Sequence, residues 1–155
     1  MNKKIAGLVC LLVCAASIVF AGSPDYRVKS RLDAKGFNYK IDDEGDFRII
    51  LKFDNGRTQL LWVNSNTENY KGMEIREVWS TGYKGYISSN IMKNLLRGSQ
   101  TKKLGAWGVN KDFNRAYFTA KIPADLDRDA LINTIWFVGE AADEFERDYM
   151  GGDDL

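Results

Sequence analysis

The amino-acid sequence predicts a single α+β domain, in which helices cover a meandering antiparallel sheet. Two periodicities support this class: apolar and polar residues alternate over residues 47–53, and apolar residues recur at helical spacing over residues 131–149. The content of 45% hydrophobic and 28% charged residues is ordinary for a globular protein. The expected element order is α-β-β-β-α-β-β-α, with no linker or internal repeat that would divide the chain.

The first 21 residues have the pattern of a secretory signal peptide. Lys3 and Lys4 supply positive charge, and residues 5–21 follow without a charge and with Ser17 as their one polar side chain. The run ends at Ala21, a small residue suited to cleavage, so we expect the mature chain to begin at Gly22 and to be periplasmic or secreted. An uncleaved anchor is the alternative, because the run reaches the lower limit of about 17 residues for a membrane span.

Both cysteines, Cys10 and Cys14, lie inside this apolar run. Each follows a valine, whereas lipoprotein processing requires a small residue there, so lipidation is not expected. The chain has no histidine, and the mature chain would have no cysteine. We therefore expect no disulfide, no Ser-His or Cys-His nucleophile pair and no thiolate or imidazole metal site.

The first element of the mature chain is expected to be a short helix. Residues 23–25 combine a capping serine, a proline suited to a first turn and an acid at the positive end of the helix dipole. Val28 and Leu32 form a thin apolar stripe, and Gly36 can end the helix with a positive φ. This helix should bury one narrow face.

Strands follow in the first half of the chain. A short strand at residues 37–41 leads into the three longer strands that the element order counts: residues 47–53, 59–64 and 73–80. Asn55-Gly56 favours a tight hairpin between the first two of these longer strands. Residues 59–64 are apolar on both faces, which is typical of a central strand, and the polar residues 65–72 are expected to form a loop.

The second half predicts helix, hairpin and helix. Ser88 or Ser89 can cap a helix that ends at residues 97–98, and a hairpin of residues 104–109 and 113–122 turns around residues 110–112. The longest helix is expected at residues 125–150. We therefore expect one domain over residues 22–150, followed by a flexible tail at residues 151–155.

Aromatic and apolar side chains divide between the core and a possible contact surface. The tryptophans Trp62, Trp79 and Trp136 are expected in the core. Tyr83, Tyr86 and Trp107 adjoin glycines at element edges, so they are candidate partner-binding residues, with core packing as the alternative. The last helix should pack on the sheet through a stripe of five residues: Leu131, Ile135, Val138, Ala142 and Phe145.

Three short segments carry a likeness to a known family: Asp42-Asp43-Glu44-Gly45-Asp46-Phe47, Glu77-Val78-Trp79-Ser80 and Glu140-Ala141-Ala142-Asp143-Glu144-Phe145-Glu146. With the element order, these segments make the chain resemble the YbjN family. The resemblance implies a fold like that of type III secretion chaperones, which are small α+β proteins that often dimerise and bind other proteins. The signal peptide is a departure from many members of the family.

Acidic residues offer the main catalytic alternative. The turn at residues 42–46 fails as a calcium loop, because Gly45 comes fourth instead of sixth and Phe53 stands where a bidentate acid is needed. Glu77 shares strand parity with Ile75 and Trp79, so it is expected on the buried face unless a bulge shifts it, and there it would be hydrogen-bonded to a backbone donor or paired with an arginine. The acids of the last helix, Asp143, Glu144 and Glu146, are expected on its solvated face.

Composition and motifs together favour binding over catalysis. The formal net charge of +1 argues against a nucleic-acid partner, and no phosphate-binding loop or credible Ser-Lys pair occurs. We expect a non-catalytic, chaperone-like protein that forms a homodimer or binds a protein partner, without a catalytic residue, a cofactor, a metal or membrane contact after signal removal. The alternatives are a hydrolase that uses paired carboxylates, and a small-ligand carrier with an apolar cavity between the long helix and the sheet.

Overall fold

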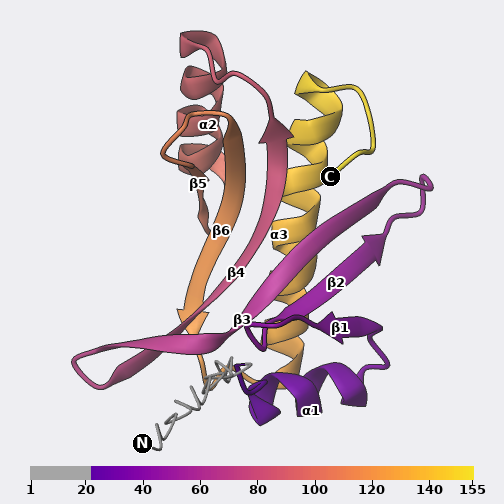
Figure 1. The fold of residues 1–155 in the computed structure, drawn as a ribbon, viewed down its shortest axis with the longest axis vertical. Helices are drawn as coiled ribbons and strands as arrows, with labels where there is room; N and C mark the ends of the chain where they lie inside the picture. The colour runs from indigo at the N-terminus through magenta and orange to yellow at the C-terminus, as the bar shows by residue number, and fades with distance from the viewer. Residues whose placement is uncertain (1–21) are drawn as a thin grey trace, which may run out of the picture.

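The computed structural model describes residues 22–155, so the predicted signal peptide lies outside the described residues. One antiparallel sheet of six strands, in the order β1-β2-β3-β4-β6-β5, is joined by three helices (Figure 1). The α+β class and the antiparallel sheet are confirmed, with one strand more than the predicted order. The elements are α1 Tyr26–Ala34, β1 Tyr39–Ile41, β2 Phe47–Lys52, β3 Thr58–Tyr70, β4 Met73–Lys84, α2 Ser89–Thr101, β5 Ala106–Val109, β6 Arg115–Pro123 and α3 Arg128–Tyr149.

The helices lie on one side of the sheet. α3 crosses β3, β4 and β6, and the five residues predicted for its packing stripe are all buried. α2 packs beside β5, where its Leu95 is buried together with Ala116 of β6 and Phe145 of α3. The opposite face of the sheet is therefore left without a covering helix among residues 22–155, as Figure 1 shows.

β3 and β4 form a longer hairpin than the sequence predicted. The expected loop at residues 65–72 is wrong, because β3 continues to Tyr70 and β4 begins at Met73. The turn is made by Lys71 and Gly72, both with positive φ, and the β3–β4 register shifts between Val63 and Thr67. The tip of the hairpin extends beyond the neighbouring strands, so its side chains are mostly exposed and lack the apolar pattern of a strand (Figure 1).

Side chains cap each helix, at positions close to the predicted ones. Asp25 caps α1 by accepting a hydrogen bond from Arg27 N, Ser88 caps α2 as predicted, and Asp127 caps α3. Among the described residues, no helix has the length and apolar content needed to cross a membrane.

The predicted core position of Trp62 and Trp79 is wrong. Their neighbours Leu61, Val63 and Val78 are fully buried beneath α3, so strand alternation places both tryptophans on the opposite face, where they are half-buried. Trp136 of α3 does pack against the core. Strand periodicity separates two faces, but it does not say which one a helix will cover when both are apolar.

Candidate functional site

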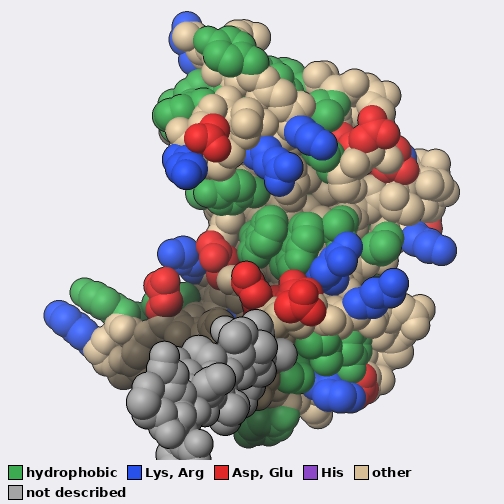
Figure 2. Space-filling model, viewed as in Figure 1, with side chains coloured by type: hydrophobic (Ala, Val, Ile, Leu, Met, Phe, Trp, Pro, Cys, Tyr) green, Lys and Arg blue, Asp and Glu red, His purple; other side chains and the backbone are tan. Residues whose placement is uncertain are grey.

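The uncovered face of the sheet carries a row of large side chains across four strands. Arg48 of β2 lies opposite Trp62 of β3, which lies opposite Trp79 of β4. Tyr117 of β6 meets the Trp79 ring edge-on, with ring centroids 6.3 Å apart. We call these four residues the aromatic row. Figure 2 shows hydrophobic side chains gathered at the centre of this face, with charged side chains around them.

The two indoles of the aromatic row stack on each other. The ring centroids of Trp62 and Trp79 are 4.3 Å apart and their planes differ by 5°, while the Arg48 guanidinium lies 5.8 Å from the Trp62 ring centroid. Trp79 Nε1 donates a hydrogen bond to Asn64 Oδ1 at 3.0 Å. A nucleic-acid base needs a free ring face on which to stack. In the aromatic row, the stacked indoles of Trp62 and Trp79 cover one face of each other.

Tyr83, Tyr86 and Trp107 lie apart from the aromatic row. The Trp107 ring packs against Phe145 at a centroid distance of 4.6 Å, and a Cβ on Gly98 would collide with it, so the core interpretation of Trp107 is favoured. Tyr83 donates its hydroxyl to the Tyr86 carbonyl at 3.2 Å. Tyr86 is 81% exposed. A partner contact at these positions stays a prediction, and Tyr86 is the one of the three that solvent reaches freely.

Glu77 lies on the uncovered face, so its predicted position on the buried face is wrong. Arg76 and Val78 take the side that faces α3, and Glu77 is half-buried opposite Lys121 of β6. Together with Glu68 it lines a hollow of approximately 120 Å³. This volume is well below the 300–1,000 Å³ or so of ordinary ligand sites. Two carboxylates, those of Glu68 and Glu77, line this hollow, and the hydrolase alternative requires paired carboxylates.

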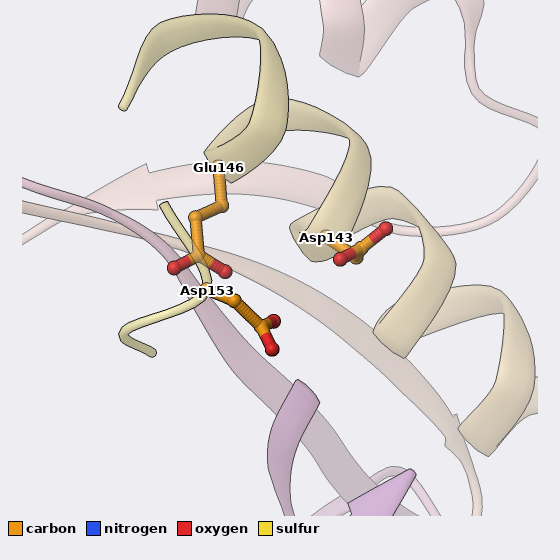
Figure 3. Close-up of side chains that lie close together, drawn as sticks. All are labelled: Asp143, Glu146 and Asp153. Carbon is orange, nitrogen blue, oxygen red and sulfur yellow. The ribbon is translucent and has the colours of Figure 1, made fainter. Parts of the chain in front are cut away.

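A second group of acids lies where α3 meets the C-terminal tail. Oxygens of Asp143, Glu146 and Asp153 come within 4.8 Å of one another, with the side chains directed to a common space (Figure 3). The predicted solvated face is wrong for Asp143 and Glu146, which are buried, and holds for Glu144, which is exposed. By ligand type, these three carboxylates are the described residues best suited to hold a cation.

Arg57 already supplies the positive charge of this carboxylate group. Its Nε donates to Asp143 Oδ1 at 2.5 Å, and its Nη2 lies 3.4 Å from Glu146 Oε2. Burial raises the pKa of Glu146. The hydrogen bond from Asp154 N–H and the positive charge of Arg57 offset part of this increase. Asp153 accepts a hydrogen bond from Thr58 N at 3.0 Å. The group therefore fastens the tail to β3 and acts as a structural clamp.

A third charged group joins α1 to the sheet. Arg76 is buried, its Nη2 donates to Asp25, and its Nη1 donates to the carbonyls of Asn64 and Ser65. The register shift after Val63 marks the irregular stretch of β3 that contains both carbonyls. This group was not predicted from the sequence, although Arg76 shares strand parity with the apolar Val78, and an arginine on an apolar strand face is a signal of a buried ion pair.

Comparison with known proteins leaves the family open. The sequence matches no family model and no curated protein. The likeness to the YbjN family therefore rests on the short sequence patterns and the element order, and it stays a prediction.

Proposed function

We propose that the mature chain is an exported, non-catalytic protein-binding domain of YbjN-like, chaperone-like type, and that the aromatic row is its contact surface. One observation carries the proposal: Trp62, Trp79 and Tyr117 lie on a sheet face that no described element covers. Tryptophan, tyrosine and arginine contribute most to protein interfaces, because they bury a large area at a small entropic cost. The partner is a second copy of the chain or another exported protein.

A charge placed beside the aromatic row tests the proposal. Leu60 is half-buried on the same face, so Leu60→Asp should put a carboxylate into the interface and weaken partner binding at least about tenfold. Leu96→Asp is the matched control, because Leu96 of α2 is 65% exposed and lies away from this face. Sedimentation over a concentration range measures self-association, and cross-linking in the periplasm measures partner capture. Equal association of both variants and wild type would overturn the proposed surface.

The hydrolase alternative has its own discriminating measurement. Glu68 and Glu77 line one hollow together, whereas the other hollow with several acids, lined by Asp54, Glu140, Asp143 and Glu144, has Asp143 paired with Arg57. A panel of glycan and ester substrates should give no turnover if the domain only binds. Turnover that is abolished by Glu77→Gln, in a protein that remains monomeric and captures no partner, would replace the binding proposal by the hydrolase.

Export is part of the same proposal. Gly22 N–H donates to the Asp43 carbonyl at 3.2 Å, and Asp25 N donates to Ser65 Oγ at 3.0 Å. The two lysines at the start, the apolar run of residues 5–21 and the small residue Ala21 support cleavage directly after Ala21. Intact-mass measurement of protein from the cell envelope should give the mass of residues 22–155. The mass of all 155 residues, or a lipid adduct on Cys10 or Cys14, would contradict cleavage.

A further inference from the structure

A hollow of approximately 630 Å³ lies beside the end of β2. β1 pairs with β2 as far as Ile49, whereas β2 continues to Lys52. β3 pairs with this last stretch on one side, and within residues 22–155 no strand pairs with it on the other side. The hollow therefore passes from the uncovered sheet face, at Ile50, around the free edge of β2 to Trp136 of α3.

The inner wall of this hollow is apolar. Phe37 and Trp136 meet edge-on, with ring centroids 6.5 Å apart, and Leu51 lies beside them. Toward the sheet face the lining continues through Leu60 and Ile50, and Ile50 is 60% exposed. An apolar body seated here would cover Ile50 and remove its surface from water.

The mouth of the hollow is cationic. Lys40, Arg48 and Lys52 line it, and none of the three has a carboxylate at ion-pairing distance among the described residues. Lys40 and Arg48 are direct register partners, so two like charges stand side by side. The fourth cation, Lys35, pairs with Asp129 at 3.0 Å. No acid lines the hollow, so an anion would relieve this repulsion.

The free edge of β2 adds a main-chain donor. Phe53 N donates to the Arg57 carbonyl at 2.9 Å. The main-chain N–H of Phe53 therefore points toward the β3 side of the strand. Main-chain groups alternate in direction along an antiparallel strand, so the N–H of Lys52 faces the open side. This N–H lies on the same edge as the cations of the mouth.

We propose that this hollow binds an amphiphile with an anionic head and an apolar body. The head lies at Lys40, Arg48 and Lys52, and the body lies against Phe37 and Trp136. Charge complementarity selects the head, and the volume falls within the range of about 300–1,000 Å³ for small-ligand sites. This ligand site shares Arg48 with the aromatic row and is also lined by Leu60, so ligand titration and association measurements are needed to test the two proposals separately.

Calorimetric titration of residues 22–155 with monomeric decanoate tests the proposal. We expect saturable binding with one ligand per chain, weaker binding at high salt, and much weaker binding of decanol and decyltrimethylammonium. Decyl phosphate, titrated in parallel, tells whether a carboxylate or a phosphate head is preferred. Equal affinity for the neutral, cationic and anionic amphiphiles, or no binding of either anion, would overturn the proposal.

Paired variants place the ligand in the hollow. Arg48→Glu with Lys52→Glu should lower the affinity for decanoate at least about tenfold, because two attractions become repulsions. Lys93→Glu with Lys111→Glu makes the same change in net charge at exposed positions outside the hollow, so it should bind as wild type does. Circular dichroism verifies that both proteins are folded. Equal losses in the two double variants would contradict the site.

Tryptophan fluorescence supplies a second readout. Decanoate should change the emission of wild type, and Trp136→Phe should lose that change while calorimetry still detects binding. Vesicles of phosphatidylglycerol separate a free amphiphile from a membrane surface. Binding to vesicles without binding of monomeric decanoate would overturn the proposal in favour of a lipid surface, and would leave the proposed protein contact untouched.

Discussion

Ile135→Ala and Phe145→Ala should each lower the free energy of unfolding by about 2–5 kcal/mol, because each removes a large buried side chain and leaves a cavity. Ile135 is fully buried between α3 and the sheet. Phe145 packs on Trp107 and Tyr149, with ring centroids 4.6 and 4.3 Å apart. Urea unfolding followed by circular dichroism measures the loss as a shift in midpoint at constant slope.

The exposed face of the same helix provides the control. Asn133 and Glu140 of α3 are exposed, so Asn133→Ala and Glu140→Ala should change the free energy of unfolding by less than about 0.5 kcal/mol. If neither Ile135→Ala nor Phe145→Ala lowered the free energy of unfolding by more than the experimental error, the inner face of α3 would have to be exposed to solvent. That result would contradict the packing of α3 on the sheet.

Local chemistry explains which elements could be predicted from the sequence. The stripe of α3 repeats over 22 residues, so its buried face follows from helical periodicity alone. The hairpin between β2 and β3 was predicted from Asn55-Gly56, and Gly56 has the positive φ of 82° that the turn requires. Ser88 or Ser89 was predicted to cap α2 for an equally local reason, and Ser88 does so by accepting a hydrogen bond from Ile91 N.

The errors occur where position depends on the rest of the fold. β3 is apolar on both faces, so nothing within the strand shows that Trp62 lies on the uncovered face. The same limit applies to Glu77. It was correctly predicted to share a face with Trp79, but that face is the uncovered one and not the buried one. The polar residues 67–70 form a strand because β4 pairs with them, and the strand propensity of single residues does not predict such pairing.

The charged groups depend on pairs that are distant in sequence. Arg57 meets Asp143 across 86 positions, and Arg76 meets Asp25 across 51. An acid three residues from another on a helix is typical of a solvated face, and only the folded chain brings Arg57 against Asp143 and Glu146. The hollow beside β2 likewise depends on the length of β1, which strand patterns define poorly.

Asp25→Asn should cost about 3–5 kcal/mol of stability, because it leaves the buried Arg76 guanidinium without its carboxylate. Asparagine is as good a helix cap as aspartate, so the loss reports on the charge. The matched control is Asp33→Asn, which breaks an exposed pair with Lys29 and should cost less than about 1 kcal/mol. Adding Arg76→Met to Asp25→Asn should recover part of the lost stability, because the buried, unpaired charge of Arg76 is then absent.

The pH dependence of the Asp25→Asn effect identifies the ionised carboxylate as its cause. Burial by itself would raise the pKa of Asp25, but hydrogen bonds from Arg27 and Arg76 outweigh it and hold the pKa well below its usual range. A lowered pKa in the folded state stabilises the fold above the unfolded value of about 4, and this stabilisation is lost as the pH falls further. The difference between wild type and Asp25→Asn should therefore be constant from pH 8 to about 5 and shrink below about 4. A difference that persists unchanged at pH 2, measured by urea unfolding, would show that the ionised carboxylate of Asp25 is not what stabilises α1 on the sheet.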